Sequence, residues 1–315
     1  MEMVNKKICF GLIVGTRGFF NPVLAGSARK ELLELLEKQG FECVIGSEED
    51  TPHGAVETLE HAKLYASLFK KNAEKIDGII VVLPNFGDEL GVVNAINMAN
   101  LDVPVLIQAC NDEIDKVDVF SRRDAFCGKI SVCNNLYQYG IKFSDTSEHT
   151  CDISGKSFEN DIRRFGAVCR TVGGLKSARI GAIGARPAAF QTVRYSEKIL
   201  QATGITVVPA DLSEIFAVAN SFDVNDVLLK EKLGEIKEYG TIPSKIVDEQ
   251  ILKQARFSVA VDNWMKENEC VASAIQCWTS IQSNFGCASC LSMSMMGEKK
   301  MPSACEVDVT GAVSM

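Results

Sequence analysis

Short apolar, β-branched runs that alternate with helical segments most constrain the fold of this chain. The clearest run is Gly78–Leu83, with the sequence Gly-Ile-Ile-Val-Val-Leu, and Pro84 ends it. Strands that are apolar on both faces and separated by helices are typical of a parallel sheet covered on both sides. We therefore predict a doubly wound α/β domain in the first half. Its predicted strands are 8–14, 41–45, 78–83 and 103–109, and its predicted helices are 25–39, 56–74 and 88–100.

The same alternation starts again near Ser177, and 315 residues suffice for two domains. We place an N-terminal α/β domain at 1–172 and a second one at 173–315, both of the Rossmann or flavodoxin type. The predicted boundary follows a helix at 157–170 and runs through Gly173-Gly174. The second domain is predicted to contain strands at 178–183, 205–209 and 271–276, and helices at 189–203, 212–219, 225–238 and 245–267.

Net charge and cysteine content limit the classes of partner and the cell compartment that we expect for this protein. A net charge of −8 argues against a nucleic-acid or anionic-membrane partner, which would select a basic surface. No window has the roughly 20 apolar residues needed to cross a bilayer. A signal peptide would have a small-residue cleavage site after its apolar run, but here Gly15-Thr-Arg-Gly18 follows the first apolar run. We therefore predict a short strand there rather than a signal peptide. Twelve cysteines without a secretion signal then predict reduced, mostly buried thiols in a cytoplasmic protein.

Two loops of the first domain follow predicted strands, where parallel sheets bind ligands. The loop at 11–18 lacks the G-x-G-x-x-G spacing of a dinucleotide site. Arg17 in this loop is a candidate ligand-binding residue or simply a solvated arginine. Phe86, in the loop after Pro84, would be exposed unless it covers a ligand or a partner. Asp88 is suited to capping the helix that follows.

Cys287-Ala-Ser-Cys290 allows three interpretations. It could be a zinc half-site, but the nearby cysteines follow no knuckle pattern. It could be a redox pair, but it lacks the thioredoxin context. We favour packing of the two thiols in an apolar wall.

Glu306-Val-Asp308 is the sharpest chemical feature. In an extended segment, residues two apart point to one face, so the two carboxylates would converge. Their neighbours include Cys305 and Met301, among which a carboxylate should have a raised pKa. Such a pair suits a general base or a hard divalent ion. The alternative is an exposed Glu306 and an Asp308 that caps a helix starting near Thr310.

The segments Val271–Trp278, Gly286–Met293 and Met301–Met315 resemble the L-fucose isomerase/L-arabinose isomerase superfamily, most closely the shorter fucose isomerase-like proteins. Weaker similarity at 15–18, 124–135 and 183–198 extends the resemblance to essentially the whole chain. It implies an intramolecular oxidoreductase of carbohydrate metabolism. Such an aldose–ketose isomerase binds Mn²⁺ and moves a proton between C1 and C2 through an enediol.

The resemblance also implies roles for individual residues. Glu306 would be a metal ligand and the acid/base, with Asp308 as a second catalytic acid beside it. Arg17 would reach the sugar of a neighbouring subunit, which implies a homo-oligomer with a small-molecule sugar as its partner. Four residues would bind the sugar: Arg17, Phe86, Gln276 and Trp278.

The family continues after the Glu motif with another carboxylate ligand and a metal-binding histidine in a C-terminal barrel domain. This sequence ends at Met315, before either. We therefore expect it to hold the first two domains of a longer enzyme, to keep its fold, to bind Mn²⁺ poorly and to isomerise little. The alternative is a catalytically silent two-domain module that binds a sugar or an effector.

Overall fold

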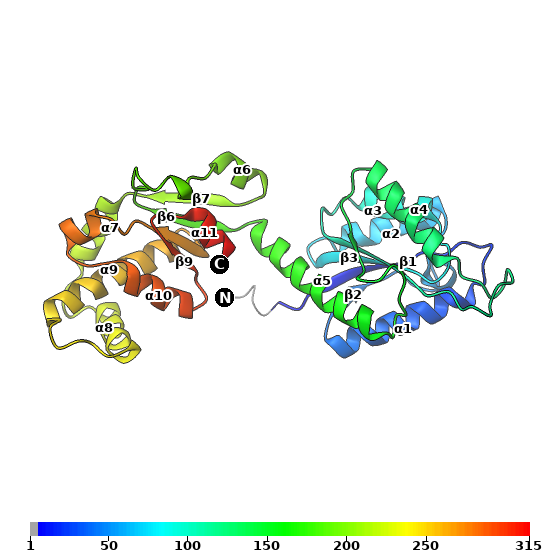
Figure 1. The fold of residues 1–315 in the computed structure, drawn as a ribbon, viewed down its shortest axis with the longest axis horizontal. Helices are drawn as coiled ribbons and strands as arrows, with labels where there is room; N and C mark the ends of the chain where they lie inside the picture. The colour runs from blue at the N-terminus through cyan, green and yellow to red at the C-terminus, as the bar shows by residue number, and fades with distance from the viewer. Residues whose placement is uncertain (1–5) are drawn as a thin grey trace. The chain divides into compact units, whose positions relative to one another are not determined.

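The computed structural model describes residues 6–315, so the first five residues of the predicted N-terminal domain lie outside it. The chain divides into two compact units between Gly174 and Leu175, each with its own parallel sheet (Figure 1). The boundary predicted from the sequence, between residues 172 and 173, lies two residues earlier. The fold class predicted from the sequence, α/β with two parallel sheets, is confirmed.

Unit 1 contains a five-stranded parallel sheet with strand order β2-β1-β3-β4-β5. Its central strand, β3, sends alternate side chains to opposite faces. Ile79, Val81 and Leu83 pack on one face with α2, α3 and α4, whereas Ile80 and Val82 pack on the other with α1 and α5. This two-sided burial explains the continuous apolar runs. The elements are β1 Cys9–Val14, α1 Val23–Gln39, β2 Glu42–Val44, α2 Leu59–Lys71, β3 Ile76–Leu83, α3 Glu89–Ala99, β4 Val105–Ala109, α4 Ala125–Gln138, β5 Ser144–Asp145 and α5 Lys156–Leu175.

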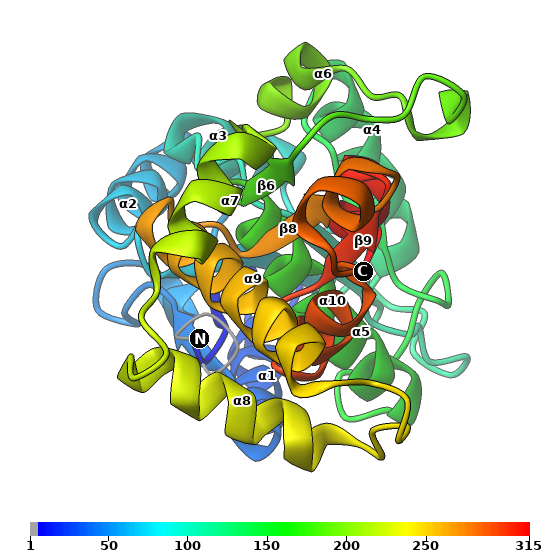
Figure 2. The same cartoon turned by 90° about the vertical axis from the view of Figure 1, so that its left-hand side faces the viewer.

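Unit 2 contains a four-stranded parallel sheet with strand order β7-β6-β8-β9. Helices α7, α9 and α10 pack on one face of this sheet, where α9 lies across the strands (Figure 2). The short α11 packs on the other face. The elements are β6 Arg179–Ile183, α6 Glu197–Ala202, β7 Thr206–Ala210, α7 Leu212–Ser221, α8 Val227–Tyr239, α9 Asp248–Glu267, β8 Ala272–Ile275, α10 Cys290–Glu298, β9 Ser303–Cys305 and α11 Val309–Ser314.

Two predictions of local structure are wrong, and one helix was missed. The helix predicted at 189–203 is reduced to a short 3₁₀ turn at Gln191–Val193 and to α6. The Arg186 guanidinium donates to the carbonyls of Pro187, at 2.9 Å, and Phe190, at 3.0 Å. These bonds hold residues 186–190, which precede the 3₁₀ turn and α6, as a loop. Gly173 and Gly174 lie in the last turns of α5 rather than in a linker. Helix α4 was missed: its buried residues follow helical spacing, but exposed apolar residues such as Phe126 and Ile130 lie between them and obscure the pattern.

The segment after Cys277 contains α10, β9 and α11. The helix expected near Thr310 is confirmed as α11. None of the helices within residues 6–315 is long and apolar enough to cross a membrane.

Candidate active site

The carboxyl ends of β8 and β9 meet at one edge of the unit 2 sheet. Ile275 pairs with Cys305 in parallel register, and both strands end there. The residues that follow, Gln276 and Cys277 on one strand and Glu306 on the other, therefore lie at the same edge. Ligands of doubly wound proteins bind at this edge, just beyond the strands.

Glu306 is held in a strained turn directly after β9. Glu306 and Val307 both have a left-handed backbone, with φ of 60° and 58°, which costs a non-glycine residue about 1–3 kcal/mol. The Cys305 thiol donates a hydrogen bond to Glu306 Oε1 at 3.2 Å. The other carboxylate oxygen, Oε2, is buried and has no hydrogen-bond partner. A buried unpartnered oxygen and backbone strain are features that concentrate at functional sites.

The predicted convergence of Glu306 and Asp308 on one face is wrong. The strand ends at Cys305, so the two-residue period of an extended chain does not continue through 306–308. Asp308 instead caps α11, because its Oδ1 accepts from the amide of Gly311 at 2.8 Å and from the Thr310 hydroxyl at 3.0 Å. The alternative role considered for Asp308, a helix cap, is confirmed.

Two thiols, those of Cys277 and Cys305, lie beside the Glu306 carboxylate, and a third, that of Cys290, lies beside Cys277. The donor atoms of Cys277, Cys305 and Glu306 lie within 4.8 Å of one another. Cys290, at the start of α10, brings its Sγ to 3.9 Å from that of Cys277. Burial, and then the hydrogen bond to Glu306, raise the pKa of Cys305 to about 12. Burial and the neighbouring Cys277 also raise the pKa of Cys290.

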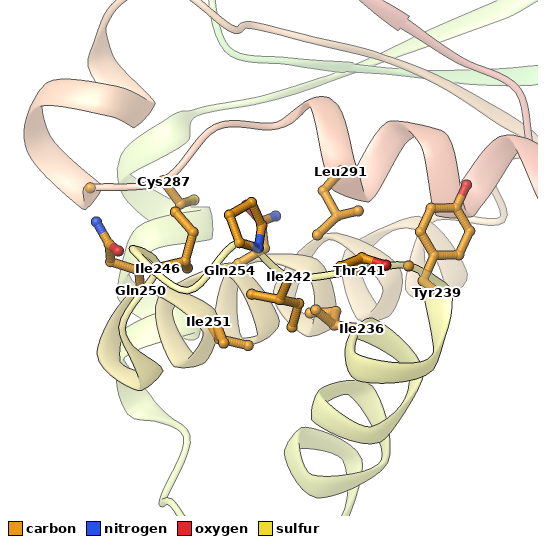
Figure 3. A pocket seen from close by; sticks show the side chains of 13 residues that line it. Ile236, Tyr239, Thr241, Ile242, Ile246, Gln250, Ile251, Gln254, Cys287 and Leu291 are labelled. Atoms are coloured by element: carbon orange, nitrogen blue, oxygen red, sulfur yellow. The ribbon is translucent and has the colours of Figure 1, made fainter.

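The Cys287-x-x-Cys290 segment does not act as one pair. Cys290 contacts Cys277, whereas Cys287 lines a cavity of about 370 Å³ in which burial raises its pKa to about 12 (Figure 3). The cavity lies between α8, α9 and the start of α10. Its walls are mainly aliphatic and include Ile236, Ile242, Ile246, Ile251 and Leu291. Packing in an apolar wall is therefore confirmed for Cys287 but does not describe Cys290.

Gln276 and Trp278 lie on the segment after β8, at the same edge of the sheet where Glu306 follows β9. The Gln276 amide accepts from the Ala185 backbone N–H at 2.9 Å and donates to the Trp278 carbonyl at 2.8 Å. Gln276 thereby ties the loops after β6 and β8 together. The Trp278 side chain is 55% exposed, and its ring lies 5.5 Å from that of Phe190. This indole offers an open apolar face at the carboxyl edge.

Arg17 and Phe86 form a second cluster at the carboxyl edge of the unit 1 sheet. The Arg17 guanidinium lies 4.5 Å from the centre of the Phe86 ring. It also donates to the Gly87 carbonyl at 3.0 Å and forms an ion pair with Glu89. Arg17 is therefore a partnered arginine and not a solvated one. Asp88 caps α3 as expected, because its Oδ1 accepts from the Gly91 amide at 2.9 Å.

Sequence reasoning missed two residues of these edges. Asn85 is fully buried, donates to the Thr16 hydroxyl at 2.9 Å and accepts from the Gly87 amide at 3.0 Å, so it joins the two loops of unit 1. Its position directly after an apolar strand was the available signal. Cys277 was set aside because the cysteines near the Cys287-x-x-Cys290 segment follow no knuckle pattern, whereas the structure brings its thiol close to those of Cys290 and Cys305.

The donor set around Glu306 does not fit Mn²⁺ by itself. Mn²⁺ prefers carboxylate, carbonyl and water oxygens. Within residues 6–315 the cluster of potential metal ligands at this edge offers one carboxylate and two thiols, and Asp308 is engaged in its cap. Soft sulfur ligands favour other ions.

A comparison with protein families matches residues 11–176, over half of the chain, to the model of the fucose/sulfoquinovose isomerase N-terminal domain. The chain belongs to this family. The superfamily predicted from the sequence is thus confirmed. The match covers essentially all of unit 1, including the Arg17–Phe86 cluster.

Curated members of the family support the same relationship. The sulfoquinovose isomerase of Priestia megaterium is 24% identical over 294 residues, which are 90% of this chain and 62% of that protein. The sulfoquinovose isomerase of Alkalicoccus urumqiensis is 32% identical over 158 residues, 48% of this chain and 34% of that protein. The chain thus spans less than two thirds of the length of these relatives.

A solved periplasmic solute-binding protein from Actinobacillus succinogenes with bound D-allose covers 98% of this chain and 88% of its own, at 13% identity. Its TM-score is 0.25, too low to support an argument.

Proposed function

We propose that this protein serves as an aldose–ketose isomerase that converts a sugar of the fucose or sulfoquinovose type through an enediol. The observation that carries the proposal is the Glu306 carboxylate, whose buried Oε2 has no hydrogen-bond partner at the ligand-binding edge of the unit 2 sheet. The family membership and the names of the relatives support the reaction class.

Glu306 is proposed to move the proton between C1 and C2. A general base must have an oxygen free to accept a proton within hydrogen-bond reach of the substrate. Oε2 meets the first condition, while the Cys305 thiol holds Oε1 and so orients the carboxylate. Asp308 differs from Glu306, because its Oδ1 is occupied as a helix cap by the Gly311 amide and the Thr310 hydroxyl. We therefore propose that it acts by holding the start of α11 beside Glu306 rather than as a catalytic acid.

The proposed sugar contacts are divided between the two units. The open indole of Trp278 is suited to stack on the apolar face of a sugar ring, and Gln276 holds the loop that carries it. Arg17 and Phe86, at the edge of the unit 1 sheet, would reach the sugar of a neighbouring subunit. A homo-oligomer and cytoplasmic location remain part of this proposal. Mn²⁺ remains a prediction of the resemblance, for which Glu306 would supply one ligand.

The test follows the proton at C2. The product of the complete gene is incubated in deuterium oxide with sulfoquinovose, L-fucose or L-arabinose, and deuterium at C2 and ketose formation are measured by NMR. We expect exchange and ketose with at least one sugar, and a loss of at least about 100-fold in Glu306→Gln, since general acid–base catalysis contributes about 10²–10⁴-fold. Asp308→Asn, which can still cap α11, should keep most of the exchange.

The same experiment separates catalysis from silent binding. A sugar that raises the melting temperature without any exchange at C2 would support the sugar-binding module instead. Equal exchange in the parent and in Glu306→Gln would exclude Glu306 as the base.

A further inference from the structure

The thiols around Glu306 make up a set of ligands that the proposed isomerisation does not use. Cys277, Cys305 and Glu306 bring three donor atoms to within 4.8 Å of one another at the ends of β8 and β9. Cys290 approaches the same cluster from α10, with its Sγ 3.9 Å from that of Cys277. We infer that Cys277, Cys305 and Glu306, with Cys290 as a fourth ligand, form a binding site for a thiophilic divalent cation such as Zn²⁺.

The distances agree with tetrahedral coordination. Zn–S bonds of about 2.3 Å place two sulfurs of a tetrahedron about 3.8 Å apart, and a sulfur and an oxygen about 3.6 Å apart. The Cys277–Cys290 separation is 3.9 Å and the Cys305 Sγ–Glu306 Oε1 separation is 3.2 Å. Cys290 Sγ lies close to Cys277 Sγ but outside the set of three donor atoms that are all within 4.8 Å of one another, so its side chain would have to turn toward the ion to become the fourth ligand.

The surroundings of the cluster also suit an ion. The buried Glu306 Oε2 has no partner, and an ion would satisfy it. The Gln282 side-chain amide donates to Cys277 Sγ at 3.6 Å, the kind of contact that stabilises a ligating thiolate. Cys290 is exposed and gives solvent access to the cluster, whereas Cys277 is buried.

The ligands deprotonate as the cation binds. Each ligating thiol loses its S–H proton to solvent and forms one metal–sulfur bond, while the Glu306 carboxylate binds without a change of charge. No oxidation or reduction occurs. Binding would engage the carboxylate that the proposed function uses as a base. The site does not depend on that function, since it rests on the positions of the thiols and the Glu306 carboxylate and not on any proton transfer.

The test uses Cd²⁺ as a spectroscopic probe for this chain, kept reduced with a non-thiol reductant. Cd²⁺ titration is followed by the ultraviolet charge-transfer absorption of cadmium–thiolate bonds, which counts sulfur ligands. We expect one tight site, occupied competitively by Zn²⁺ and not by excess Mn²⁺. Cys305→Ser and Cys277→Ser should each lower the affinity by at least about tenfold and reduce the absorption.

Cys287→Ser is the matched control, because Cys287 lies three residues from Cys290 but faces the apolar cavity. It should bind Cd²⁺ as the parent does. Because Cys277 is buried, its serine variant could misfold, and Cys290→Ser, at an exposed position, is therefore tested as well. Cys290→Ser should lower the absorption while the circular dichroism stays unchanged. The proposal is overturned if Cys305→Ser and Cys290→Ser bind like the parent, or if Cys287→Ser loses binding equally. Neither result would affect the test of isomerisation, which is read at C2 of the sugar.

Discussion

At the scale of single residues, the site depends on which carboxylate has its oxygens free. Glu306 and Asp308 are two residues apart, yet only Glu306 keeps a buried oxygen without a partner. Asp308 Oδ1 instead accepts hydrogen bonds from the Gly311 amide and the Thr310 hydroxyl, and both bonds stabilise the first turn of α11. The left-handed backbone at Glu306 and Val307 separates the two roles.

The capping role of Asp308 can be measured through stability. Asp308→Ala should lower the free energy of unfolding by about 1 kcal/mol, because the Gly311 amide loses its acceptor. Asp308→Asn should cost much less, since asparagine also caps helices. Urea unfolding of the three proteins measures the difference. Equal stability of the alanine variant and the parent would contradict the cap.

At the scale of elements, close packing of α4 against the loop after β3 positions Phe86. A Cβ added at Gly128 in α4 would lie 1.5 Å from the Phe86 carbonyl oxygen, a backbone atom that cannot move aside alone. Only glycine therefore allows α4 to approach the loop this closely.

Gly128→Ala should therefore destabilise the protein by about 1–3 kcal/mol or more, as overpacking does. Gly173→Ala, in α5, has no atom within 4 Å of the added Cβ. It should raise stability by about 0.5–1 kcal/mol, because alanine is the better helix former. Denaturant unfolding should show that Gly128→Ala lowers the free energy of unfolding and that Gly173→Ala raises it. Changes of the same sign in both variants would refute this packing argument.

Helices α8 and α9 and the end of α10 are joined by an ionic cluster. Lys232 is bonded to Asp262 at 2.8 Å and to Glu235 at 2.7 Å, and Glu235 also binds Lys299. Hydrogen bonds from Lys232 and then Lys299 lower the pKa of Glu235. Burial opposes the charge of Lys232, but its bonds to Asp262 and Glu235 outweigh it and raise the pKa.

The cluster predicts how stability changes with pH. Because the pKa of Glu235 is lowered in the folded state, its contribution is present above the unfolded glutamate pKa of about 4.3 and disappears as pH falls through the folded value. The contribution of Lys232 is present below about pH 10.4 and disappears as pH rises through its raised value.

Lys232→Met should therefore reduce the loss of stability below about pH 4.3, by less than about 1 kcal/mol because Glu235 is partly exposed. Lys237→Met, at an exposed position of the same helix, should keep the pH profile of the parent. Urea unfolding between pH 3 and pH 7, about the range of glutamate titration, makes the comparison. If Lys232→Met lost as much stability at acid pH as the parent does, the proposed contribution of the Lys232–Glu235 ion pair would be contradicted.

At the scale of the whole molecule, each unit has its own sheet and its own buried cores. Unit 1 buries two apolar clusters, one on each face of its sheet. Unit 2 has separate clusters around its own strands, and the proposed base lies in it. A unit with a core of its own can in principle fold alone.

We therefore expect fragments 1–174 and 175–315 each to unfold cooperatively in urea when produced separately. Fragment 175–315 should also keep the Cd²⁺ site, because its ligands all lie in unit 2. A fragment without a cooperative transition would show that its core needs the rest of the chain.

Much of the fold could be predicted from local patterns. Amphipathic helices such as α1 and apolar strands such as β3 have a clear period, and Gly40 ends α1 in a left-handed conformation as glycine allows. Helix α4 was harder to predict, because exposed apolar residues such as Phe126 and Ile130 obscure the helical spacing of its buried residues. The loop at 184–196 could not be predicted, because the contacts of Arg186 decide it.

The sequence by itself determined the α/β class, the parallel sheets and the family, since these depend on residue order alone. Only the tertiary structure decided that Asp308 is a cap, that Cys290 belongs with Cys277 rather than Cys287, and that Arg17 is partnered. The physical reason is that parallel strands bring together residues from distant segments. Ile275 and Cys305 become neighbours across 30 positions, and with them the thiols that surround the carboxylate.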